Sequence, residues 1–252
     1  MSLKTKILII VILLTISCKQ TEDDTITIAT AANMQFPIEA ISEAFTTHTG
    51  IKNDLIIGSS GKLTAQIKEG APYDIFVSAN MKYPEEIYRS GLAVRPPEIY
   101  GYGQLVLWSM HDSIQPFVTL LANENIHHIA IANPKTAPYG EAAIEVLKHY
   151  RIYDTIKEKL VYGESIAQTN QFIMSKSSEI GFTAKSIVLS PRMKGKGNWV
   201  ALDKKVYQQI DQGVVMIKQK NRNGKNAQQF YDFLFSKEAK KILEDFGYLV
   251  AE

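Results

Sequence analysis

Apolar residues along the chain follow two periods, and these alternate from one segment to the next. Residues 25–30 alternate apolar and polar side chains, which is typical of a strand with one buried face. Residues 36–48 instead place Phe36, Ile41 and Phe45 on one helical face. Further strands are predicted at residues 54–57, 74–78, 104–108, 129–132, 179–183 and 213–217. Further helices are predicted at residues 63–69, 84–89, 141–150, 154–159, 166–175, 226–235 and 237–246. Strands that alternate with helices predict an α/β fold.

Two points on the chain carry glycine and polar residues of the kind expected where the backbone passes between lobes. They are residues 101–103 and 207–212. Crossings there predict a discontinuous first lobe from residues 25–103 and 209–252. Residues 104–208 would then form a second lobe that is inserted into the first.

The amino end differs from the rest of the chain. Lys4 and Lys6 precede an apolar run that ends in a small residue, Ser17, so residues 1–17 are predicted to be an export signal. The alternative is a single membrane-spanning helix. The run is short for a hydrocarbon core, which favours the signal.

Cys18 is the only cysteine of the chain and directly follows this leader. Its position resembles a bacterial lipoprotein signal, in which the cysteine is lipidated and becomes the first residue. The resemblance implies lipidation at Cys18 and a polar tether over residues 18–24. The protein would then be exported and held at the periplasmic face or the cell surface. The alternative is a secreted protein with an incidental cysteine.

The composition of the 252-residue chain is that of an ordinary globular protein, with 45% hydrophobic residues. Its 28 basic and 26 acidic residues give a net charge of +2 and are mixed along the chain. This balance gives no reason to expect a nucleic-acid partner.

Four loops lead into predicted helices, and the first three of them follow predicted strands. They are residues 31–33, 58–62, 133–140 and 163–166. The first turn of a helix has unpaired N–H groups, which together with the helix dipole attract anions. Ordinary N-capping explains any one of these loops taken alone. Four such loops, two from each predicted lobe, favour an anion site between the lobes.

Motifs for enzymatic chemistry do not fit these loops. A nucleotide-binding P-loop ending at Gly61 and Lys62 needs a glycine at position 56, where the chain has Ile56. The serines of residues 58–61 lack the G-x-S-x-G spacing of a nucleophile elbow. The five histidines show no metal-ligand spacing. The loops contain no arginine, which disfavours an organic acid as ligand.

Several segments form a recognisable set when they are taken together. They are Ala31-Ala32-Asn33, Gly58-Ser59-Ser60-Gly61-Lys62-Leu63, residues 70–79, residues 133–140, residues 162–168 and the C-terminal segment from Phe230 to Tyr248. In this combination the chain resembles the bacterial periplasmic molybdate-binding proteins, the solute-capturing components of ABC importers. The resemblance implies a two-lobed periplasmic-binding-protein fold, type II-like. Each lobe would be a mixed sheet flanked by helices, and the ligand cleft would lie between the lobes.

The resemblance also implies which residues hold the oxyanion. Ser60 would give its hydroxyl and its backbone N–H. Asn33 would give its backbone N–H and its side-chain amide, and Ala32 a further N–H. Tyr139 and Ile166 would give mainly backbone N–H groups. No catalytic residue and no cofactor are implied, because molybdenum would be bound as molybdate, or tungsten as tungstate, through these same donors.

The implied partners are the anion, the ABC permease of the inner membrane and, through the lipid anchor, the membrane, for a protein that is itself a monomer. Lys62 and Lys135 lie beside the loops, but they are expected to be solvated and outside the site. Two other readings stay open. One is a receptor of the same fold for sulfate or phosphate. The other is an exported enzyme or sensor domain that uses the two-lobed fold.

Overall fold

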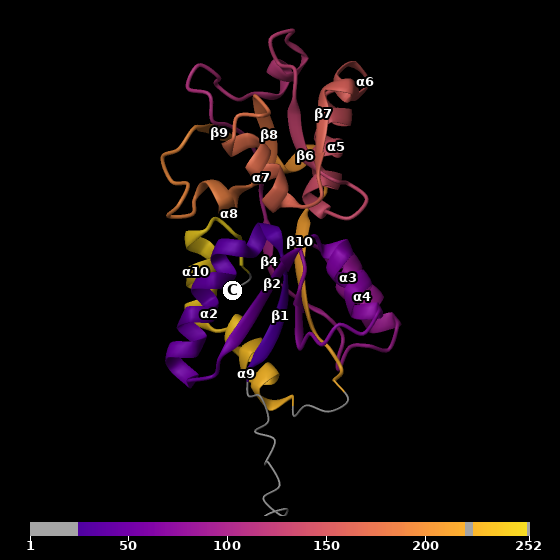
Figure 1. Cartoon of the computed structure of the whole chain (residues 1–252), viewed down its shortest axis with the longest axis vertical. Helices are drawn as coiled ribbons and strands as arrows, with labels where there is room; N and C mark the ends of the chain where they lie inside the picture. The colour runs from indigo at the N-terminus through magenta and orange to yellow at the C-terminus, as the bar shows by residue number, and fades with distance from the viewer. Residues whose placement is uncertain (1–24, 220–223, 251–252) are drawn as a thin grey trace, which may run out of the picture.

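The computed structural model describes residues 25–219 and 224–250, so the predicted export signal and Cys18 lie outside the described part. Two lobes follow one another along the long axis of the molecule (Figure 1). Each lobe contains one five-stranded mixed sheet with helices packed against it. The predicted two-lobed α/β fold is therefore confirmed. Within the described residues, no helix combines the length and the apolar character needed to cross a membrane.

The first sheet has the strand order β2-β1-β3-β10-β4. The strands β1, β2 and β3 are parallel, whereas β10 is antiparallel to both β3 and β4. Its strands are β1 (Ile26–Ala31), β2 (Asn53–Gly58), β3 (Ile75–Val77), β4 (Glu98–Gly103) and β10 (Ile210–Met216). Its helices are η1 (Ala32–Met34), α2 (Gln35–Thr49), α3 (Ser60–Lys68), α4 (Lys82–Arg89), α9 (Lys225–Leu234) and α10 (Lys237–Asp245).

The central strand β3 is apolar throughout because both of its faces are covered. Successive strand residues point to opposite faces. Ile75 therefore packs in a core with α2, α9 and α10, whereas Phe76 packs in a separate core with α3 and α4. Val214 and Val215 of β10 divide between the two cores in the same way. A continuous apolar run thus predicts a buried strand here better than alternation does.

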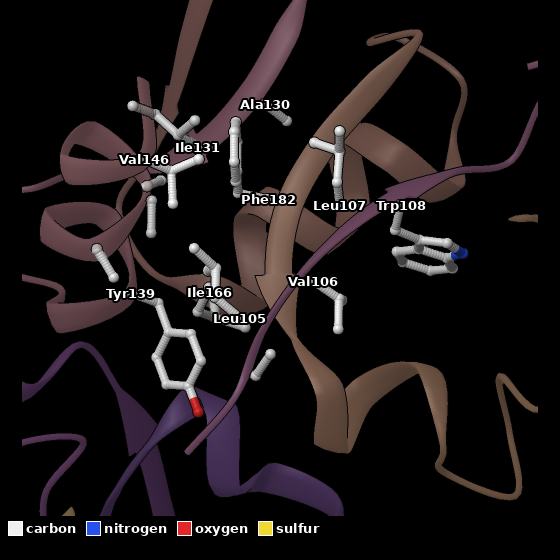
Figure 2. Packing of buried hydrophobic residues seen from close by; sticks show 14 of the residues in the cluster. Leu105, Val106, Leu107, Trp108, Ala130, Ile131, Tyr139, Val146, Ile166 and Phe182 are labelled. Carbon is white, nitrogen blue, oxygen red and sulfur yellow. The ribbon is translucent and has the colours of Figure 1, made fainter. Parts of the chain in front are cut away.

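The second sheet has the order β7-β6-β8-β5-β9 and repeats the pattern of the first. The strands β6, β7 and β8 are parallel, and β5 is antiparallel to both β8 and β9. Its strands are β5 (Leu105–Ser109), β6 (Ile129–Ala132), β7 (Leu160–Gly163), β8 (Ile180–Ala184) and β9 (Asn198–Ala201). Its helices are η2 (Val118–Ala122), α5 (Pro138–His149), α6 (Tyr153–Ile156), η3 (Lys157–Lys159), α7 (Ile166–Met174), α8 (Lys185–Val188) and η4 (Lys204–Val206). Leu107, Ile131 and Phe182 of the sheet belong to one core with Val146 of α5 (Figure 2).

The backbone passes between the two sheets twice. Only Gln104 separates β4 from β5, and the return passes from η4 into β10. The strands β4, β7 and β9 were absent from the sequence-based prediction. The helices α3 and α5 begin earlier than predicted, at Ser60 and Pro138. Both shifts matter for function, because they place Ser60 and Tyr139 in first helical turns rather than in the preceding loops.

Candidate functional site

A small cavity lies between the lobes. Its lining consists of Ala31, Ala32, Asn33, Gly58, Ser59, Ser60, Ala79, Ala137, Pro138, Tyr139 and Ile166. All five residues predicted from the sequence are therefore brought together around one space, and no lining residue carries a charge. The empty volume is about 200 Å³.

A larger hollow, with an empty volume of about 1030 Å³, lies elsewhere, on the outer face of the first lobe between α2 and β2. It is wide open to solvent and contains residues from one lobe only. The interlobe cavity is the better candidate, because ligands of open α/β sheets bind at the carboxyl ends of the strands.

Each predicted residue stands at the start of a helix that follows a parallel strand. Ala32 and Asn33 open η1, Ser60 is the first residue of α3, Tyr139 is the second of α5 and Ile166 is the first of α7. Residues at these positions have N–H groups with no acceptor inside their own helix. Four helix starts from two lobes thus point their dipoles toward one cavity.

Ordinary side-chain capping accounts for only one of the four helix starts. At α3 the Ser59 hydroxyl accepts the Lys62 N–H at 3.4 Å. At η1, α5 and α7 the N-cap residue makes no side-chain hydrogen bond to the helix. Even Ser165, which could cap α7, does not do so. The N–H groups of these three starts are therefore available to an anion, as is general for helix N-termini.

The Ser60 hydroxyl is set up to act as a donor. Ser60 is completely buried, and its Oγ accepts the backbone N–H of Ala79 at 3.0 Å. With an oxygen lone pair used in this way, the hydroxyl proton remains free to donate. Ser60 can therefore offer a ligand both its hydroxyl and its helix-start N–H.

The side chain of Asn33 does not have the role that was expected of it. Its Nδ2 donates to Gln212 Oε1 at 2.9 Å and to Tyr248 Oη at 2.8 Å. An amide nitrogen has two hydrogens, so both are already engaged. The expected amide donation from Asn33 to the anion is wrong for this structure, and its backbone N–H is the remaining donor.

Gln212 was not recognised as part of the site from the sequence. It is fully buried, and its Oε1 accepts from Asn33 and from Tyr100 Oη, the latter at 2.9 Å. Its Nε2 donates to Tyr139 Oη at 3.3 Å. From the sequence, residues 207–212 were predicted only to be a crossing between the lobes. A glutamine just inside an apolar strand was the signal that could have identified it.

The tyrosines of this network are neutral hydrogen-bonding groups. Burial raises the pKa of Tyr139 and of Tyr100 well above the ordinary value. Burial also raises the pKa of Tyr248 to about 12, although hydrogen bonds with Ser186, Asn33 and Tyr139 oppose the rise. No phenolate charge therefore faces the cavity near neutral pH.

Contacts at the rim join the two lobes. The Gly61 N–H donates to the Thr136 carbonyl at 2.9 Å, and Lys62 Nζ lies 2.7 Å from a carboxylate oxygen of Glu164. In each pair the first residue belongs to the first lobe and the second to the second lobe. The structure is thus a closed form, with the two lobes in contact at the rim. Lys62 forms an ion pair across the rim and Lys135 is exposed to solvent. Neither lysine lines the cavity.

The cavity lining offers a small anion neutral hydrogen-bond donors. The lining has hydroxyls, yet it has no histidine, carboxylate or lysine to activate one. No cluster of histidine, cysteine, aspartate or glutamate suited to a metal ion occurs in residues 25–219 and 224–250. The chemistry available is hydrogen bonding from neutral donors.

Comparison with known proteins agrees with this geometry. Residues 26–249 match the family described as bacterial extracellular solute-binding protein. The chain is 35% identical to the molybdate-binding protein ModA of Rhodobacter capsulatus over 222 residues, covering 88% of this chain and 86% of that protein. It is 34% identical to ModA of Azotobacter vinelandii over 224 residues, covering 88% of each.

A solved structure gives the same result. The periplasmic molybdate-binding protein of Azotobacter vinelandii superimposes with a TM-score of 0.85 and 32% sequence identity, covering 90% of this chain and all of that one. The fold and the sequence agree over nearly the whole described length. The chain therefore belongs to the bacterial extracellular solute-binding proteins.

Proposed function

We propose that the protein is the solute-binding component of an ABC importer and captures molybdate or tungstate between its lobes. The observation that carries the proposal is the uncharged cavity on which four helix starts converge, two from each lobe. The similarity to two ModA proteins and to a periplasmic molybdate-binding protein supports the choice of ligand.

The donors suit a tetrahedral dianion. Ser60 would donate its hydroxyl and N–H, and Ala32, Asn33, Tyr139 and Ile166 would donate N–H groups. Each hydrogen bond to a charged group contributes about 1.5–3 kcal/mol. Because the donors belong to rigid helix starts, the size of the cavity selects among anions. Molybdate and tungstate are nearly equal in size, so both should bind, whereas the smaller sulfate should bind more weakly.

The lobes would close on the anion by a hinge motion at the two crossings, and a permease in the membrane would receive it. The protein would act as a monomer, without a cofactor and without catalytic activity. Export is supported by the family to which the chain belongs and by the periplasmic relative. A lipid anchor at Cys18 is supported by the apolar leader before it. The intact mass of the membrane-extracted protein tests this anchor, because lipidation adds the mass of the lipid to the chain that begins at Cys18.

Calorimetric titration of the exported protein with molybdate, tungstate, sulfate and phosphate tests the proposed ligand. We expect one molybdate or tungstate per chain, with similar affinities, and much weaker binding of sulfate and phosphate. Tight binding of sulfate or phosphate without molybdate would instead support a receptor of the same fold for another oxyanion. Binding of none of the four would favour the exported enzyme or sensor domain.

A further inference from the structure

The amide of Gln212 connects the candidate donors of the two lobes. Gln212 lies on β10, close to the return crossing. Its Oε1 accepts from Asn33 Nδ2 of the first lobe at 2.9 Å, and its Nε2 donates to Tyr139 Oη of the second lobe at 3.3 Å. Tyr100 Oη donates to the same Oε1 at 2.9 Å and restrains the amide from the first-lobe side. A single buried side chain thus contacts both halves of the site.

Space for the Tyr139 hydroxyl exists because residue 103 is glycine. The Tyr139 ring extends from the start of α5 toward the first lobe (Figure 2). A Cβ atom on Gly103 would lie 2.2 Å from Tyr139 Oη and 2.4 Å from Gln212 Nε2. Non-bonded contacts this short essentially never occur for a Cβ atom, so a side chain at position 103 would displace the Tyr139 hydroxyl or the Gln212 amide. Gly103 and Gln212 therefore form a slot at the end of the first sheet, and a tyrosine of the other lobe fills it.

The slot also fixes the position of a candidate donor. Tyr139 is the second residue of α5, so its backbone N–H and its ring move together with that helix. Gly103 of β4 and Gln212 of β10 lie on neighbouring strands of the first sheet, where Gly103 pairs with Ile210 and Gln212 pairs with Gly101. When the ring end is held in the slot, the start of α5 is held at a set distance from Asn33. Burial keeps the phenol protonated, since the pKa of Tyr139 is well above its ordinary value.

We propose that Gly103 and Gln212 form a docking site for the Tyr139 hydroxyl that is completed as the lobes close, and that Gln212 is a positioning residue setting the lifetime of the closed complex. This inference rests on the proposed function, because the lifetime concerned is that of the bound anion. Gln212 acts through Asn33 and Tyr139 and does not line the cavity.

Tyr139→Phe tests the docking contact, because it removes the hydroxyl and keeps the ring and the backbone N–H. Tyr73→Phe is the matched control: the Tyr73 hydroxyl also bonds a glutamine, donating to Gln66 Oε1 at 3.0 Å, but inside the first lobe. Each protein is loaded with molybdate and mixed with excess tungstate, and the molybdenum retained is followed by mass spectrometry. We expect Tyr139→Phe to release molybdate about 3- to 10-fold faster than wild type, and Tyr73→Phe to match wild type.

Thermal unfolding separates docking from simple structural support. If the contact forms on closure, Tyr139→Phe leaves the unfolding midpoint of the ligand-free protein unchanged and reduces only the rise that molybdate produces. Equal losses of stability with and without molybdate would overturn the proposal. An unchanged release rate in Tyr139→Phe would also overturn it.

Gly103→Ala provides a second and stronger test. Its new Cβ occupies the slot, so we expect faster release than in Tyr139→Phe. In the double variant with Tyr139→Phe the hydroxyl clash is gone, and the nearest ring atom, Cζ, lies 3.1 Å from the Cβ. The remaining close contact, 2.4 Å to Gln212 Nε2, is with the end of a flexible side chain that can shift. Release should then slow relative to Gly103→Ala alone, and failure of this rescue would contradict the slot. Failure of the wild-type protein to bind molybdate would contradict the proposed function instead.

Discussion

The two lobes are built on one plan but present different chemistry to the cavity. Each sheet has three parallel strands followed by two strands in antiparallel pairing. In each lobe the candidate donors follow the edge strand of the parallel set and the strand beside it, β2 and β1 in the first lobe and β7 and β6 in the second. The first lobe adds a side-chain hydroxyl from Ser60, whereas the second offers only helix-start N–H groups.

Because of this difference, anion binding should tolerate side-chain substitutions at the donor positions of the second lobe better than at Ser60 of the first. The donors of the second lobe belong to the backbone, so a change of side chain at Ile166 leaves its N–H in place. They depend instead on closure, because α5 and α7 reach the anion only when the lobes meet. A donor of the first lobe such as Ser60 depends on the identity of its own side chain. Variants can therefore separate loss of closure from loss of a donor.

The largest effect should come from blocking closure. A Cβ on Gly61 would lie 3.0 Å from the Cα of Thr136 in the opposite lobe. Gly61→Val should therefore keep the lobes apart and remove the hydrogen bonds from Tyr139 and Ile166 together. At about 1.5–3 kcal/mol per bond, we expect the binding free energy to weaken by about 3–6 kcal/mol, as measured by calorimetry with molybdate.

Gly224→Val is the control for that experiment, because a Cβ on Gly224 meets no atom within 4 Å. It should bind molybdate like wild type. The new Cβ on Gly61 also comes 3.0 Å from the Tyr83 hydroxyl in its own lobe, at the far end of a side chain that can shift. The ligand-free unfolding midpoint of Gly61→Val should therefore stay close to wild type. Wild-type affinity in Gly61→Val would show that the second lobe contributes little.

An intermediate effect is expected from removing the one side-chain donor. Ser60→Ala loses the hydroxyl and leaves the Ala79 N–H without its acceptor. We expect molybdate binding to weaken by about 1–3 kcal/mol in calorimetry. Ile166→Val is the matched change in the second lobe, and it should cost about 0.5–1.5 kcal/mol of stability with no loss of affinity. Equal affinity losses in the two variants would end the distinction between side-chain and backbone donors.

The sequence was a good guide to the helix starts around the cavity, because their signals are local. Predicted strands followed by alanine, glycine, serine or asparagine identify the points where β1, β2 and β6 lead into helices, and the start of α7 was predicted without the strand β7 before it. The run of β6 is apolar because this strand is buried along its whole length. The donors Ser60 and Ile166 could therefore be placed in first turns, or beside them, without any knowledge of long-range contacts.

The network behind the cavity could not be predicted in that way. Asn33 and Gln212 are 179 residues apart and meet only because β10 returns to the first sheet after the whole second lobe. Local patterns contain no information about this pairing, so the Asn33 amide was wrongly assigned to the ligand. The strand β4 was missed for a different reason, since Gly101 and Gly103 weaken its strand pattern while making room for other groups.

The smallest effect should come from the charges at the rim, where the lobes differ in sign. Lys62 and Lys82 of the first lobe pair with Glu164 and Glu141 of the second, at 2.7 and 3.5 Å. The side chains of Lys62 and Glu164 are about half exposed, at 51% and 56%, so the pair should contribute less than about 1 kcal/mol. Its Coulomb interaction is also screened by salt.

When the lobes open, Lys62 loses its partner and its charge attracts a dianion, whereas Glu164 repels one. Lys62→Gln should therefore slow molybdate association at low ionic strength, and Glu164→Gln should not, although both remove the same ion pair. Stopped-flow association at low and at physiological salt measures the difference, which should shrink as salt rises. If both variants lose affinity equally and their association rates match wild type, the rim charges only hold the lobes together. The first lobe would then have no electrostatic advantage as the place where the anion first binds.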